Sequence, residues 1–262
     1  MTGLLDRILD SKREHVRELR GQRLPTPPPR RPVALKRGPG QPLHLLAEIK
    51  RRSPSAGELS TRLSVAERAA RYSEEGVALI SVLTDTPFFG GSYRDLETAR
   101  ATSQSPLLCK DFIIDETQLD AARAWGADAA LLIVRCLEMT VLRRLILAAR
   151  ARDLVPVVEV TTATEATAAL EAGAEVVGVN ARDLDTLTMN RARATKVLHA
   201  LPEPIVALHL SGLASPEDVT EVATSRADGA LVGEALMRQD DPRALLRAML
   251  QAAGAARAAQ TL

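Results

Sequence analysis

The sequence predicts an α/β protein built as a single (β/α)8 barrel with a helical extension at its N-terminus. Short apolar runs alternate with longer amphipathic ones from residue 43 almost to the C-terminus, which is the pattern of repeated βα units on a parallel sheet. Eight such units are present, as a closed barrel requires. An open doubly wound sheet is the alternative, but no GxGxxG segment follows the first apolar run.

The N-terminal segment precedes this alternation. Leu5, Ile8, Leu9, Val16 and Leu19 recur at roughly helical spacing, and the proline-rich stretch LPTPPPRRP ends any helix there. We therefore expect residues 1–42 to form a helix and connector, an appendage to a barrel domain at 43–262.

Within the barrel, each expected strand is followed by its helix. Gly76, Gly126 and Gly173 each end a helical run shortly before the next strand, as short αβ loops do. Strands are expected at 43–49, 78–83, 106–110, 129–134, 156–160, 175–179, 205–210 and 229–233. Helices are expected at 64–76, 93–103, 116–125, 138–152, 162–172, 190–199, 215–223 and 242–254.

Composition favours a small-molecule function. Thirty-four basic residues balance thirty-three acidic ones without a block of like charge, so neither a nucleic acid nor a membrane is an expected partner. Cys109 and Cys136 form no CxxC, and the four histidines share no ligand spacing, so no metal is expected. Charges at Asp6, Arg7 and Asp10 interrupt any signal peptide, and no apolar run reaches membrane-spanning length. We expect a cytoplasmic protein, a monomer or a weak homo-oligomer.

The expected carboxyl ends of the strands carry complementary acids and bases, and this is where such barrels build active sites. Because side chains alternate along a strand, Glu48 and Lys50 can both point into the barrel mouth while Ile49 packs outward. For any one residue the solvated rim is the simpler interpretation, but convergence favours a site. The candidates are Glu48, Lys50, Lys110, Glu159, Asn180 and Arg182. Asp111 is expected to face outward or to cap the following segment.

Two further features suggest a ligand. Ser211, Gly212 and Gly233 precede helix starts in the last two βα loops, where this fold often binds phosphate, although ordinary turn glycines are the alternative. Phe89 and Phe112 lie just beyond strand ends and indicate a flat apolar ligand. Phe88 lies there too, but packing on the barrel rim explains it as well.

Several motifs in order resemble those of the indole-3-glycerol phosphate synthase family, a group of phosphate-binding TIM barrels. They are AEIKRRSPSAGEL at 47–59, SVLTDTPFFGGSYRDL at 81–96, LLCKDFIIDETQL at 107–119, VEVTTATEATAALEAGAEVVGVNARDLDTL at 158–187 and ALVGEALMR at 230–238. The resemblance spans almost the whole chain, including the N-terminal helix. Sibling phosphate-binding barrels would not be expected to carry EIKRRSPS, CKDF and VNARDLDTL together.

The resemblance implies a cofactor-free carboxy-lyase of tryptophan biosynthesis. Its substrate would be 1-(o-carboxyphenylamino)-1-deoxyribulose 5-phosphate and its products indole-3-glycerol phosphate, carbon dioxide and water. Lys110 resembles the acid of ring closure, while Lys50, Glu48 and Glu159 could share the later proton transfers. Asn180 and Arg182 resemble orienting groups. The phosphate cradle would comprise Ser53, Ser211, Gly212, Gly233 and Glu234, and the aryl pocket Pro54, Phe89, Phe112, Leu131, Leu184 and Leu187.

One position departs from the family pattern. The resemblance implies a glutamate before Ser211-Gly212, but this chain has Leu210, which can neither accept a hydrogen bond nor balance a cation. His209 is expected to face the helices and is a poor substitute. A slower enzyme or an altered substrate is therefore expected. A non-catalytic phosphate-ligand-binding barrel, and a sugar-phosphate isomerase or Schiff-base aldolase using Lys110, remain as alternatives.

Overall fold

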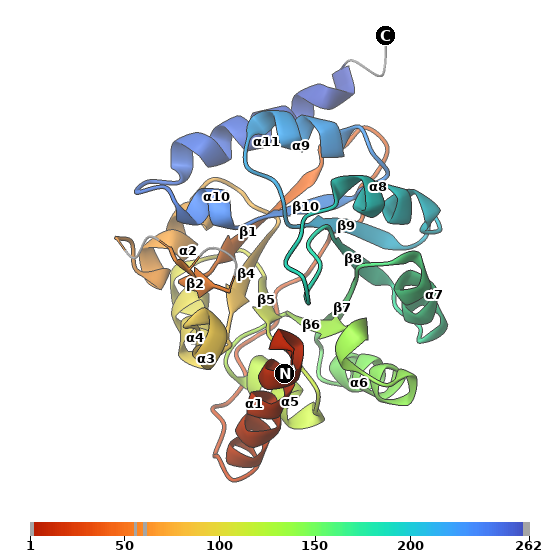
Figure 1. The fold of residues 1–262 in the computed structure, drawn as a ribbon. Helices are drawn as coiled ribbons and strands as arrows, with labels where there is room; N and C mark the ends of the chain where they lie inside the picture. Colours follow the sequence, from red (N-terminus) through yellow and green to blue (C-terminus); the bar gives the residue numbers. More distant parts are fainter. Residues whose placement is uncertain (1–2, 55–56, 60–61, 259–262) are drawn as a thin grey trace.

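A computed structural model of the chain describes residues 3–54, 57–59 and 62–258, and it shows a closed barrel of eight parallel strands (Figure 1). Residues 1–2 of the expected N-terminal segment, 55–56 of the motif at 47–59, and 60–61 and 259–262 of the expected barrel domain lie outside the described residues. Around the barrel the order is β1-β10-β9-β8-β7-β6-β5-β4, which excludes the open sheet. The strands are β1 (His44–Ile49), β4 (Leu79–Leu83), β5 (Leu107–Lys110), β6 (Ala129–Ile133), β7 (Val155–Val160), β8 (Val176–Asn180), β9 (Val206–Leu210) and β10 (Gly229–Val232). Each lies within one residue of its predicted bounds.

The eight predicted helices are also present. Their starts are set by N-caps, as in α2 and α9, where Ser64 and Ser215 form capping boxes with the residue three positions on. The helices are α2 (Val65–Glu74), α4 (Tyr93–Thr102), α5 (Glu116–Ala124), α6 (Met139–Ala151), α7 (Ala163–Glu171), α8 (Arg191–Ala200), α9 (Pro216–Ala223) and α11 (Arg243–Ala258).

Four short elements in the βα loops were not predicted. They are a two-stranded hairpin of β2 (Arg52–Ser53) and β3 (Gly57–Glu58), the helices α3 (Thr86–Phe89) and α10 (Glu234–Met237), and the 3-10 turn η1 (Val134–Cys136). Each follows the carboxyl end of a barrel strand, so together they shape the mouth. No helix within the described ranges is long and apolar enough to cross a membrane.

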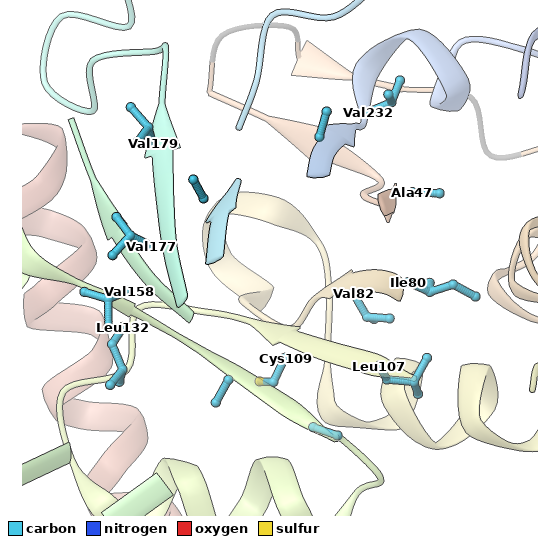
Figure 2. Packing of buried hydrophobic residues seen from close by; sticks show 14 of the residues in the cluster. Ala47, Ile80, Val82, Leu107, Cys109, Leu132, Val158, Val177, Val179 and Val232 are labelled. Carbon is cyan, nitrogen blue, oxygen red and sulfur yellow. The ribbon is translucent and has the colours of Figure 1, made fainter. Parts of the chain in front are cut away.

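Strict alternation along the strands divides the core into two layers. In β1, Leu46 belongs to the cluster inside the barrel, while Ala47 and Ile49 pack outward against the helices. Figure 2 shows part of this outer layer, formed by residues such as Ile80, Val82 and Cys109. Apart from Phe112, the buried side chains of the inner layer are aliphatic, and the charged residues at the strand ends lie above this packed layer.

The N-terminal segment contacts both ends of the barrel. Helix α1 (Leu4–Leu19) lies beside α5, and its Leu5 and Ile8 join the inner cluster (Figure 1). The connector then crosses the opposite end, where the backbone N–H groups of Arg31 and Arg37 donate to the buried Asp128 and Asp228 ahead of β6 and β10.

Candidate active site

Four charged side chains meet at the carboxyl ends of β1, β5 and β7. Lys50 Nζ lies 2.6 Å from Glu48 Oε1. Lys110 Nζ lies between two carboxylates, 3.7 Å from Glu159 Oε2 and 4.0 Å from Glu48 Oε2. The structure thus brings together the acids and bases that the strand ends predicted.

Glu48, Lys50, Lys110 and Glu159 form what we call the ionic cluster, and residues at the end of β8 hold it in place. Asn180, at the end of β8, donates from Nδ2 to Glu159 Oε1 at 2.9 Å, and its Oδ1 accepts from the backbone N–H of Arg182. Arg182 Nη1 in turn donates to the carbonyl of Leu187, whose φ of 58° is in the left-handed region. These bonds fix the loop after β8 over the barrel mouth.

Burial and neighbouring charges shift the pKa values of this cluster in opposite directions. Burial alone would raise the pKa of Glu48, but Lys50 and Lys110 outweigh it and the pKa is lowered. Burial alone would lower the pKa of Lys110, but Glu159 and Glu48 raise it above the ordinary value. Lys110 is therefore a protonated ammonium group at neutral pH, next to two proton acceptors.

Two adjoining pockets open from the cluster and share Glu48, Lys50, Arg182 and Ser211. The first, which we call the apolar pocket, contains the predicted ring contacts. Phe89 and Phe112 form one of its walls, with ring centroids 6.0 Å apart. Its lining includes Ser53, Pro54, Phe89, Lys110, Phe112, Leu131, Glu159, Asn180, Leu184 and Leu187.

The second, which we call the glycine pocket, is formed by the last two βα loops. Ser211 and Gly212 both have positive φ, 70° and 86°, which turns the chain sharply after β9. A Cβ on Gly233 would lie 2.5 Å from Glu48 Oε1, so only glycine lets the loop approach the ionic cluster. Gly212, Gly233 and Glu234 line this pocket, but Ser53 lies in the apolar pocket instead.

Of the two placements expected for Asp111, the outward one is wrong, and its Oδ1 instead accepts from the backbone N–H of Phe112 at the start of the following segment. Asp111 is 1% exposed and lies 2.6 Å from the ammonium group of Lys12, on helix α1. It also contributes to the apolar pocket, together with Leu4, Leu5 and Ile8 of the same helix. The apolar spacing of that helix could have indicated a buried face, but not that the face meets the site.

The two residues before Ser211 take the orientations expected from alternation. Leu210 points into the barrel, is 2% exposed and covers Gly178, where a Cβ would lie 2.6 Å from Leu210 Cδ1. His209 is buried on the outer face of β9, in a cavity lined by Arg191 and His199 of α8 and by Glu221 of α9. It therefore cannot replace a carboxylate at the barrel mouth.

The burial of His209 predicts loss of stability in acid. Burial, helped by the Arg191 charge, lowers its pKa to about 4, well below the ordinary 6.5. The folded state therefore binds fewer protons than the unfolded one, and stability is lost as the pH falls from about 6.5 towards 4, by about 3 kcal/mol in all. In His209→Gln, urea unfolding at pH 7 and pH 4.5 should show a smaller drop than in the parent. The exposed His199→Gln is the control, and equal drops in all three proteins would contradict the prediction.

Among the described residues, no group of three or more His, Cys, Asp or Glu side chains could hold a metal ion. The site is instead an arrangement of proton donors and acceptors beside two pockets. A closed parallel barrel with such a cluster at its strand ends defines the class of (β/α)8-barrel enzymes.

Comparisons with known proteins narrow this class. The family model for indole-3-glycerol phosphate synthase matches residues 5–249. A protein of that name from Saccharopolyspora erythraea is 41% identical over 258 residues, which cover 95% of each chain. Another from Kineococcus radiotolerans is 46% identical over 83% of this chain and 79% of its own. The chain belongs to the indole-3-glycerol phosphate synthase family.

Solved structures agree on the fold. A 3-hexulose-6-phosphate synthase from Salmonella typhimurium has a TM-score of 0.66 and 16% identity, and covers 80% of this chain and 98% of its own. A thiamine phosphate pyrophosphorylase from Pyrococcus furiosus has a TM-score of 0.60 and 20% identity, and covers 82% of this chain and 96% of its own. At these identities the likeness shows the barrel alone.

Proposed function

We propose that the chain converts 1-(o-carboxyphenylamino)-1-deoxyribulose 5-phosphate to indole-3-glycerol phosphate, carbon dioxide and water. Family membership over residues 5–249 supports the activity. The observation that carries it in this chain is the position of Lys110, a cation in the lining of the apolar pocket between Glu159 and Glu48, the second of which also lines the glycine pocket. A substrate with an aryl carboxylate at one end and a phosphate at the other suits such a pair of pockets.

The first bond forms when the ring carbon that bears the carboxylate attacks the ketone carbon of the sugar chain. Negative charge then develops on the ketone oxygen, and Lys110 donates the proton that turns it into a hydroxyl group. Its raised pKa keeps that proton available at neutral pH. Loss of carbon dioxide returns an electron pair to the ring carbon.

The second half of the reaction removes water. The hydroxyl group leaves with a proton from an acid, and a base takes a proton from the ring-side carbon or nitrogen. Lys50, Glu48 and Glu159 share these roles, since Lys50 and Glu48 are a contacting pair and Glu159 lies beside Lys110. Asn180 orients Glu159 through its hydrogen bond.

Two binding regions would hold the substrate in the folded pose that ring closure needs. Backbone N–H groups of Gly212, Gly233 and Glu234, with Ser211, would bind the phosphate in the glycine pocket, and Ser53 would reach it from the apolar pocket. The aryl carboxylate would pair with Arg182. The ring would lie against Pro54, Phe89, Phe112, Leu131, Leu184 and Leu187.

Incubating the purified protein with the substrate, while following indole fluorescence, tests the proposal. Product should appear with enzyme-like kinetics, and inorganic phosphate should inhibit by competing for the glycine pocket. If no product forms, the alternative supported by Leu210, a barrel that binds phosphorylated ligands without turnover, takes its place. Trapping of an imine on Lys110 by borohydride would instead indicate aldolase-type chemistry.

A further inference from the structure

One lysine of the N-terminal helix is buried at the barrel mouth and shared by two aspartates. Lys12 Nζ lies 2.8 Å from Asp85 Oδ2, after β4, and 2.6 Å from Asp111 Oδ1, after β5. The lysine side chain is 1% exposed and both carboxylates are fully buried. Burying three charged groups is costly unless each is well paired, so this cluster needs an explanation beyond the docking of a helix.

Each aspartate also fixes the backbone of an aromatic residue in the apolar pocket. Asp85 Oδ1 caps α3 by accepting from the N–H groups of Phe88 and Phe89, at 2.8 and 3.3 Å. Asp111 Oδ1 accepts from the N–H of Phe112 at 2.7 Å. The two carboxylates therefore hold the segments that carry the pocket's aromatic wall, and Lys12 joins them.

We propose that Lys12 is a positioning residue that sets the separation of Phe89 and Phe112, and with it the fit of the substrate's aryl ring. Lys12 does not line either pocket, so it acts through Asp85 and Asp111. A lysine that only anchored α1 would need one carboxylate, whereas this one spans the two segments. The expected change in KM rests on the proposed function. The effect of Lys12 on the positions of Phe89 and Phe112 does not.

The Lys12→Met variant tests the kinetic consequence. We expect KM for the carboxyphenylamino substrate to rise by about tenfold or more, because small displacements of binding groups weaken a fitted pose strongly. The inhibition constant of inorganic phosphate should stay within about twofold, because the glycine pocket makes no contact with the Lys12 cluster. Arg13→Met, at a 59% exposed position of the same helix, is the matched control.

A second variant, Asp85→Asn, tests the same proposal if Lys12→Met does not fold. Asp85→Asn keeps a side-chain oxygen that can cap α3 and leaves Lys12 paired with Asp111, but it removes the attraction between Lys12 and α3. We expect a folded protein whose KM is raised several-fold, with phosphate inhibition unchanged. An unchanged KM in Asp85→Asn, or a parallel loss of phosphate affinity in either variant, overturns the proposal.

Amide hydrogen exchange gives a readout that needs no activity. In Lys12→Met the amides of Phe88 and Phe112 should exchange at least about tenfold faster than in the parent, whereas in Asp85→Asn, which keeps the Lys12–Asp111 pair, only the amide of Phe88 should do so. The amides of Ala214 and Ser215, bonded to Asp218, should not change. If the parent forms no product but the exchange pattern appears, the proposed function fails and the positioning role of Lys12 stands. Unchanged exchange at Phe88 and Phe112 overturns that role.

Discussion

Replacing Lys110 by methionine should lower turnover by about 10² to 10⁴-fold, the range expected when a positioned proton donor is removed. Methionine has a similar length but no ammonium group that could donate a proton. Glu159 and Glu48 would also both lose the cation that they share. KM should change far less than kcat, because neither pocket depends on Lys110 for most of its lining. Steady-state kinetics with indole fluorescence measures both constants.

The matched control for this variant is Lys196→Met, on the exposed face of α8. It removes the same charge away from the barrel mouth and should keep parental kinetics. Circular dichroism of both variants checks that the barrel is folded. A Lys110→Met protein that kept more than about a tenth of the parental kcat would exclude Lys110 as the acid of ring closure.

The inward-facing residues at the strand ends could be predicted from the sequence because side chains alternate in direction along each barrel strand. A buried strand alternates inward and outward residues, so Glu48 and Lys50 had to share a face, and Ile49 had to pack against the helices. The carboxyl ends of parallel strands then gather at one edge. Lys110, Glu159 and Asn180 follow from the same rule, which needs no knowledge of distant contacts.

Asp111 shows where this approach fails. Next to Lys110 on the strand, it should face away from the mouth, but it follows the last residue of β5, where alternation no longer holds. Its partner, Lys12, comes from a helix far away in the sequence. The contribution of Leu5 and Ile8 to the apolar pocket depends on the same docking. Such contacts depend on how the chain returns to the barrel, and no local pattern encodes them.

Replacing Leu210 by glutamate should raise turnover by about tenfold, equivalent to about 1.4 kcal/mol of transition-state stabilisation. Among the residues that line the apolar pocket, Lys50, Lys110 and Arg182 are cations, and Glu48 and Glu159 are the carboxylates that face them, since the third carboxylate, Asp111, is paired with Lys12. Leu210 is paired in register with Asn180 on β8 and with Leu231 on β10, so a carboxylate there would lie on the inner face beside the cluster. It would add a proton acceptor and balance the third cation.

The expected gain in turnover comes with a loss of stability, which the control variant Leu210→Gln measures separately. Leu210 is buried and fills the space over Gly178, so any polar replacement should lower the free energy of unfolding, by about 1 to 3 kcal/mol for an unpaired amide. Leu210→Gln has the shape of the glutamate without its charge, and should lose stability without gaining turnover. If Leu210→Glu has an unchanged or lower kcat, or if glutamine gives the same increase, the missing carboxylate does not limit this enzyme. If only glutamate increases kcat, the apolar residue at the end of β9 limits a site whose other charged groups are already in place.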